Sequence, residues 1–168
     1  LLARGANVRG VCMLNGGLFP ERHRPVLTQK LLASPLGGLV ARLSSYRTFS
    51  AQMKRIWGRT PPSDDELRAC WRLVTEGNGL RVMPELIGYI AERKKHRDRW
   101  VGALVTLAAP RRFINGMLDP ISGAHMVARY RELMPDGDIV ELSDVGHYPQ
   151  LEAADRVEDA AVSFLARC

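Results

Sequence analysis

Three short β-rich runs lie near the two ends of this chain, and a long stretch of helical periodicity separates the first from the other two. The runs span residues 8–14, residues 112–115 and Asp138–Leu142; an Asn, Gly or Pro residue lies just before each one, and Asn15 and Gly116 end the first two. Such apolar runs bounded by turn residues are typical of buried strands. A helical segment follows the second run and another follows the third. This alternation predicts parallel strands joined by right-handed crossovers, and therefore an α/β fold.

The segment between the first and second strands is predicted to be an all-α cap, or lid, of about 80 residues. Ser63 and Glu66 have the spacing of a capping box, and the residues that follow repeat at the interval of one helix face. Gly77-Asn78-Gly79 is predicted to end that helix. The same periodicity predicts further helices over residues 83–90 and 100–107, with weaker patterns over residues 26–32 and 36–43.

These patterns divide the chain into three parts. Residues 1–20 are expected to hold the first core strand and the end of the helix before it. Residues 21–105 form the helical cap, and residues 106–168 form the C-terminal core. Trp57 and Trp71 lie in the cap, where they could line an apolar pocket, although their helical spacing favours packing in the core of the cap.

Charge and composition narrow the possible partners. The net charge of +6 is compatible with binding to nucleic acid. However, the densest basic stretch, residues 93–99, is not accompanied by a nucleic-acid-binding motif. We interpret it as a solvated helix end and expect no nucleic-acid partner. No apolar run approaches the ~20 residues of a membrane span, and no signal peptide is evident, which favours a cytoplasmic protein. The three cysteines match no metal-binding spacing, so we expect idle thiols and neither a metal nor a cofactor.

Two residues that could carry chemistry follow neighbouring predicted strands. Asp119 comes just after the second strand and His147 just after the third. Because the carboxyl ends of parallel strands meet at one edge of the sheet, we expect both side chains at that edge and within hydrogen-bonding reach. A carboxylate there can accept the Nδ1 proton of the imidazole and leave Nε2 to act as a base. The order acid, then histidine, is the order found in α/β hydrolases.

Several short segments resemble that family. Residues 116–120 resemble its acid turn, G-x-x-D-P, and residues 146–152 resemble its histidine loop, G-H-x-x-x-x-E. Residues 14–21, 93–95 and 99–104 are similar to members of the epoxide-hydrolase and haloalkane-dehalogenase branch. The resemblance implies the C-terminal part of an α/β-hydrolase fold, in which three parallel strands with flanking helices carry an inserted all-α cap.

The resemblance also assigns roles to particular residues. It places Asp119 as the acid and His147 as the base of a catalytic triad. Some members carry the acid after the strand that matches residues 8–14, but this chain has Asn15 there, so Asp119 is the better candidate. Epoxide hydrolases use lid tyrosines to hold the epoxide oxygen, and Tyr89 lies near the region of one of them. The alternative for Tyr89 is ordinary packing within the lid.

The nucleophile of the triad is absent from this sequence. In this fold it occupies a sharp strand-to-helix turn between small residues, and no such elbow with serine or aspartate occurs in the chain. The chain also lacks an initiator methionine, so we expect it to be part of a longer protein. The resemblance then places the first five strands and the oxyanion-hole loop upstream, with residues 1–6 finishing the helix after the elbow.

Two classes of function remain open at this point. The parent protein would hydrolyse a small, mainly apolar substrate such as an epoxide, a haloalkane or an ester, with an upstream aspartate or serine as nucleophile. Alternatively, the chain is a non-catalytic remnant or a protein-interaction module of the same fold, because an unpaired first strand exposes a sheet edge that is prone to association.

Overall fold

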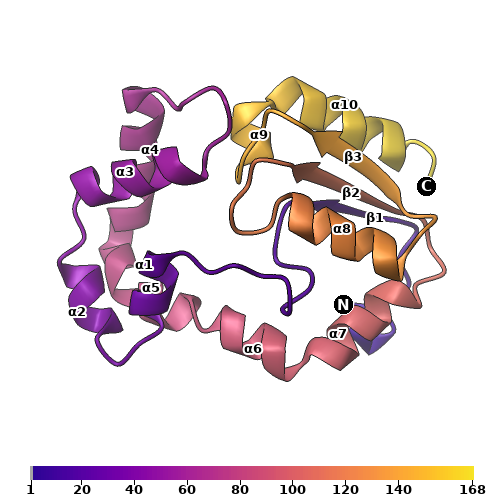
Figure 1. Cartoon of the computed structure of the whole chain (residues 1–168), viewed down its shortest axis with the longest axis horizontal. Helices are drawn as coiled ribbons and strands as arrows, with labels where there is room; N and C mark the ends of the chain where they lie inside the picture. Colours follow the sequence, from indigo (N-terminus) through magenta and orange to yellow (C-terminus); the bar gives the residue numbers. More distant parts are fainter. Residues whose placement is uncertain (1) are drawn as a thin grey trace.

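A computed structural model describes residues 2–168, and its sheet has three parallel strands (Figure 1). These are β1 (Val11–Leu14), β2 (Arg111–Gly116) and β3 (Asp138–Leu142), in the spatial order β1-β2-β3. Leu14 lies opposite Ile114, and Gly116 lies opposite Leu142. The predicted set of neighbouring parallel strands is therefore confirmed, although the first strand begins at Val11 rather than at residue 8.

Helices cover both faces of this sheet because successive strand residues point to opposite sides. Phe113 packs on one side with residues of α7 (Arg97–Val105) and α8 (Ala124–Leu133). Ile114 packs on the other side against α10 (Ala154–Leu165). The short helix α9 (Pro149–Glu152) comes between β3 and α10. These two apolar layers fix the strands, and the loops at their carboxyl ends carry the candidate site.

The segment between β1 and α7 is helical and lies beyond the carboxyl ends of the strands (Figure 1). Ser63 caps one of its helices as predicted, because its hydroxyl accepts a hydrogen bond from the Glu66 amide (3.2 Å) and the Glu66 carboxylate accepts one from the Ser63 amide (2.8 Å). The helices of this segment are α1 (Leu27–Leu32), α2 (Gly37–Arg42), α3 (Tyr46–Ile56), α4 (Asp64–Thr75), α5 (Gly79–Leu86) and α6 (Tyr89–Lys95).

Some helix boundaries differ from the predicted ones. The helix predicted over residues 83–90 is broken between α5 and α6, where Gly88, a weak helix former, follows Ile87. The predicted stop after α4 is confirmed, since Gly77 and Asn78 have φ values of 56° and 64°. Near the N-terminus, Leu2–Arg4 form a single 3-10 turn, and residue 1 of the predicted helix end lies outside the described residues. Within residues 2–168, no helix is both long and apolar enough to cross a membrane.

Candidate active site

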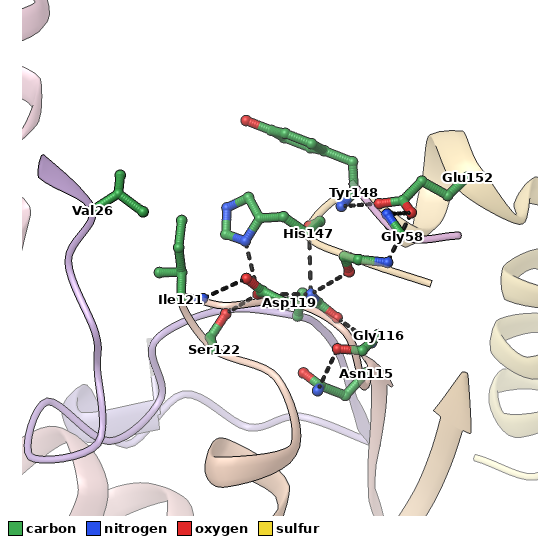
Figure 2. A network of polar contacts seen from close by, with 12 residues as sticks. Val26, Gly58, Asn115, Gly116, Asp119, Ile121, Ser122, His147, Tyr148 and Glu152 are labelled. Carbon is green, nitrogen blue, oxygen red and sulfur yellow. Dashed lines mark hydrogen bonds and ion pairs between the residues drawn. The ribbon is translucent and has the colours of Figure 1, made fainter. Parts of the chain in front are cut away.

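The carboxylate of Asp119 is buried among hydrogen-bond donors just beyond the end of β2 (Figure 2). Its Oδ1 accepts a hydrogen bond from the Ile121 amide (2.7 Å). Its Oδ2 accepts hydrogen bonds from the Ser122 hydroxyl (2.6 Å), from the Asn15 side-chain amide (3.1 Å) and from Nδ1 of His147 (2.8 Å). The side chain has no exposed surface, so these donors replace the water that would otherwise solvate the charge.

Opposing influences act on the pKa of Asp119. Burial raises it, because an ionised carboxylate is poorly solvated inside the protein. The hydrogen bond from His147, the positive charge of that ring when protonated, and the hydrogen bonds from Ser122 and Ile121 lower it. The donors outweigh burial, and the pKa of Asp119 lies below its ordinary value. The group is therefore ionised at neutral pH.

His147 follows β3 and meets Asp119 at the shared edge, which confirms the predicted contact. Its main-chain amide donates a hydrogen bond to the carbonyl of Ile56 (2.8 Å). The ring lies edge-on to that of Tyr148, with centroids 4.9 Å apart and an interplanar angle of 84°. The side chain remains 22% exposed, and within residues 2–168 no hydrogen bond engages Nε2. With Nδ1 donating to an ionised acid, Nε2 is the nitrogen that can accept a proton.

The loop of His147 is held by a carboxylate from α9. One oxygen of Glu152 accepts hydrogen bonds from the amides of Gly58 and Gly146 (2.7 Å each), and the other accepts one from the amide of Tyr148 (2.9 Å). Figure 2 shows Glu152 beside Gly58, at the point where the helical segment between β1 and α7, which we call the lid for its position, meets the histidine loop. A single side chain therefore fixes the backbone on both sides of His147 and connects it to the lid.

Further contacts join the lid to this loop. The amide of Arg59 donates to the carbonyl of Asp144 (2.8 Å), and the indole of Trp57 lies 5.7 Å from the Tyr148 ring, measured between centroids. The backbones approach so closely that a Cβ atom at Gly58 would collide with the carbonyl oxygen of Asp144. We call the set of contacts between residues 56–59 and residues 144–152 the lid latch.

Asn15 and His23 were not expected to contribute to the site. The sequence marks Asn15 only as a position without an acid, whereas its side-chain amide contacts Asp119 directly. His23 lies beside the acid turn, because the amide of the next residue, Arg24, donates to the carbonyl of Ile121 (3.2 Å). Both ring nitrogens of His23 are buried without a partner among the described residues. Burial and the nearby charge of Arg93 lower the pKa of His23. No motif marked this histidine.

The other residues singled out in the sequence are in the lid. Tyr89 begins α6, is exposed, and receives a hydrogen bond from the Gln29 amide at 3.5 Å. Among residues 2–168, no hydrogen bond or ring stacking joins Tyr89 to Asp119 or His147. Trp57 is buried with Met53 and Leu67, and Trp71 packs against Phe49 with ring centroids 5.3 Å apart. Both tryptophans therefore contribute to packing.

The described part of the chain, residues 2–168, brings no three His, Cys, Asp or Glu side chains together in a way that could hold a metal ion. The cysteines are half-buried and unlinked. Burial raises the pKa of the Cys12 thiol, which disfavours the reactive thiolate. The acid and the base that the structure brings together at this edge of the sheet are Asp119 and His147.

A scan against protein-family models finds no match for the chain. Among curated proteins, the mesoderm-specific transcript protein of Mus musculus is 40% identical over 150 residues, which cover 86% of this chain and 45% of that protein. LipZ of Mycobacterium tuberculosis, provisionally named a hydrolase, is 38% identical over 162 residues, which cover 95% of this chain and 56% of LipZ. These proteins are homologues, and the chain spans about half the length of the curated relatives it matches.

Solved structures of similar fold match almost the whole chain. A loop variant of a haloalkane dehalogenase from Bradyrhizobium elkanii has a TM-score of 0.69 at 16% identity, covering 98% of this chain and 61% of its own. An α/β-hydrolase-fold protein from Burkholderia ambifaria has a TM-score of 0.71 at 16% identity, covering 96% and 59%. The epoxide hydrolase CorEH has a TM-score of 0.67 at 14% identity, covering 99% and 62%.

Proposed function

We propose that this chain, whose fold is that of the C-terminal part of an α/β hydrolase, supplies the acid and the base of a hydrolase, with Asp119 as the acid and His147 as the base. The observation that carries the proposal is the 2.8 Å contact between Nδ1 of His147 and the buried carboxylate of Asp119. This contact selects the tautomer that leaves Nε2 free to accept a proton. The ionised carboxylate also stabilises the imidazolium that forms during the reaction.

The nucleophile would come from a segment outside this sequence. If it is an aspartate, it forms an alkyl ester with the substrate, and His147 activates the water that hydrolyses that ester. If it is a serine, His147 takes its proton as it attacks and later assists hydrolysis of the acyl-enzyme. In both cases Asp119 orients the imidazole ring and His147 acts as a general base, so their geometry supports a hydrolase without selecting the nucleophile.

The proposed substrate is a small, mainly apolar molecule such as an epoxide, a haloalkane or an ester, and no cofactor is required. The names of structurally similar proteins, a haloalkane dehalogenase and an epoxide hydrolase, support this range. We propose residues 21–105 as the insertion that forms the cap over the site, with its last helix, α7, returning to pack on the sheet beside Phe113, and residues 1–20 and 106–168 as the core. Tyr89, which begins α6 and is exposed, is a proposed substrate contact within that cap, because its place in the sequence resembles that of a lid tyrosine of epoxide hydrolases.

A second candidate function rests on the missing elbow. A chain with the acid and the base but no nucleophile would act as a non-catalytic remnant or an interaction module. Within residues 2–168, β1 pairs with β2 alone, so its other edge is open to another strand. The coding sequence upstream of residue 1 separates the two candidates: an open frame with a Gly-x-Asp-x-Gly or Gly-x-Ser-x-Gly elbow favours the enzyme.

Turnover measurements test the proposal directly. The 168-residue chain and a version extended by its upstream coding sequence are assayed on aryl esters, epoxides and haloalkanes. We expect no turnover by the chain alone, because covalent catalysis needs a nucleophile. In the extended protein, His147→Ala should lower the rate by several orders of magnitude, since triad members act as a unit.

His96→Ala, at a partly exposed lid histidine, is the matched control and should leave the rate unchanged. Turnover by the purified 168-residue chain that survives His147→Ala would overturn the assignment. An extended protein that carries the elbow and still hydrolyses none of the three substrate classes would favour the non-catalytic alternative.

A further inference from the structure

We propose that Asn15 is a positioning residue that holds the Asp119–His147 pair in its working arrangement. Its side-chain amide joins the loops that follow all three strands and donates to the oxygen of Asp119 that accepts the His147 proton. The inference rests on the proposed function of the pair. Its first test, however, measures the pair in the chain itself and needs no turnover.

The backbone of Asn15 explains where its side chain points. Its main-chain amide donates a hydrogen bond to the carbonyl of Ile114 (3.0 Å) and so continues the pairing of β1 with β2. The residue is therefore anchored at the end of β1. Its φ is +35°, in the left-handed region that asparagine tolerates better than most residues. The chain thus turns sharply at the end of the strand, and the side chain reaches the loops after β2 and β3.

The side chain uses its donor and acceptor groups on both neighbouring loops. Its Oδ1 accepts a hydrogen bond from the Gly116 amide (2.7 Å) at the end of β2. Its Nδ2 donates to Asp119 Oδ2 (3.1 Å) and to the carbonyl of Gly146 (3.1 Å), with a longer contact to the carbonyl of His147 (3.4 Å). The amide therefore fixes the acid turn and the histidine loop relative to each other.

The chemistry of this position requires an amide and not an acid. An aspartate at residue 15 would keep an acceptor for the Gly116 amide but would place an oxygen where Nδ2 now faces Asp119 and the Gly146 carbonyl. Two carboxylates at such a separation cannot both ionise readily, so the pKa of the pair rises. Asn15 instead supplies a neutral donor that stabilises the ionised form of Asp119.

The first test follows the Asp119 carboxyl titration by carbon NMR and the low-field resonance of the His147 Nδ1 proton, in the 168-residue chain. Asn15→Asp should raise the apparent pKa of the coupled carboxyls by about 1–3 units and shift the Nδ1 resonance. Asn15→Ala should raise the pKa of Asp119 by less, because it removes a donor without adding a charge. Asn78→Asp is the matched control, since Asn78 is the other left-handed asparagine and is exposed.

Circular dichroism establishes that each variant is folded. If Asn15→Asp does not fold, Asn15→Ala is measured in its place, because alanine adds no charge and is smaller than asparagine. An unchanged Asp119 titration together with an unchanged Nδ1 resonance, in whichever folded variant is measured, would overturn the proposal. A shift of equal size in Asn78→Asp would overturn it too, since the effect would then not belong to this position.

The second test uses the extended protein. Asn15→Ala should lower kcat by about 10- to 100-fold, because a small misplacement of the catalytic groups is enough to cost that much, with little change in KM. The acid limb of the pH–rate profile should also move, because it reports protonation of the coupled Asp119–His147 pair, whose hydrogen bonding Asn15→Ala alters. A uniform loss of rate with an unmoved profile would indicate a merely structural role and count against the proposal.

The two tests separate the proposals. Expected NMR shifts in a chain whose extended form has no turnover would refute the proposed function and leave the positioning role standing. Turnover that depends on His147 but is unchanged by substitution of Asn15 would support the proposed function and refute the positioning role.

Discussion

The carboxylate of Asp119 stays ionised although it is buried. Removing an ionised carboxylate from water is costly unless donors replace the lost solvent. Here those donors come from three separate stretches of chain: the acid turn itself, the end of β1 and the histidine loop. Their geometry leaves the carboxylate ionised and fixes its Oδ2 toward the imidazole. Burial thus helps to fix the orientation of the Asp119 carboxylate and the His147 ring, because no water competes for that oxygen.

The depressed pKa of Asp119 predicts a pH-dependent contribution to stability. A carboxyl whose folded pKa lies below its unfolded value of about 3.9 stabilises the fold above that value, and the contribution is lost as pH falls through the folded pKa. Asp119→Asn should therefore lower the free energy of unfolding by about 1.5–3 kcal/mol at pH 7. The difference from wild type should shrink steadily below about pH 4.

Urea unfolding of both proteins at pH 7, 4 and 3 measures this difference. Asp65→Asn, at an exposed position in the first turn of α4, provides the control for a lost surface charge. A gap between wild type and Asp119→Asn that stayed constant from pH 7 to pH 3 would contradict the prediction.

The sequence predicted that Asp119 and His147 lie close together because each directly follows a strand. The carboxyl ends of parallel strands meet at one edge of the sheet, so recognising the strands was enough. The sequence did not locate the contacts of Asn15 or the position of His23. The side-chain partners of Asn15 lie 101 to 132 positions away along the chain, and hydrophobic periodicity carries no information about such contacts. His23 follows β1 within an irregular segment, where no period or capping pattern points to its neighbours.

At the level of secondary structure, the strands were easier to predict than the lid helices. β-rich runs bounded by turn residues are short and distinct, whereas consecutive lid helices share one continuous periodicity. The break between α5 and α6 lies at Ile87 and Gly88, which both keep right-handed helical backbone angles, so the periodicity of the sequence does not mark it. Helix α3, which buries Met53 in the lid, was covered only by the general expectation of an all-α insertion. Its boundaries depend on capping by Ser45, a pattern that the preceding weak segments obscure.

Glu152 is expected to control the order of the histidine loop. Its two oxygens accept three backbone hydrogen bonds. A glutamine has one carbonyl oxygen and an N–H group, so Glu152→Gln must turn a donor toward at least one of these amides. We expect a loss of about 1–3 kcal/mol in the free energy of unfolding. Amide hydrogen exchange at Gly58, Gly146 and Tyr148 should also become faster.

Glu158→Gln is the matched control, because Glu158 is exposed on α10 and should change stability by no more than about 0.5 kcal/mol. Unchanged exchange at all three amides in Glu152→Gln would show that the carboxylate does not order the loop.

Across the whole molecule, the lid and the sheet are expected to unfold together. Trp57 belongs to the lid but packs against Tyr148 of the core, so its fluorescence reports on the junction. In a variant with Trp71→Phe and Trp100→Phe, Trp57 is the remaining tryptophan. Its urea transition should coincide with that of far-ultraviolet circular dichroism, as expected for a two-state unit. A fluorescence change at clearly lower urea would indicate a lid that detaches before the sheet unfolds.

The lid latch limits how freely evolution or a designer can exchange parts of this fold. Inserted caps are commonly imagined as interchangeable modules, grafted at two junctions with the scaffold left as it was. Here the graft would carry a hidden third junction, because residues 56–59 supply the carbonyl and the amides to which the histidine loop is bonded. A foreign cap without that short stretch of backbone would bring its own pocket, but the histidine loop would lose these hydrogen bonds. The side chain of His147 would then no longer be held in its orientation. Successful chimeras of this chain should therefore inherit the loop and residues 56–59 as one piece.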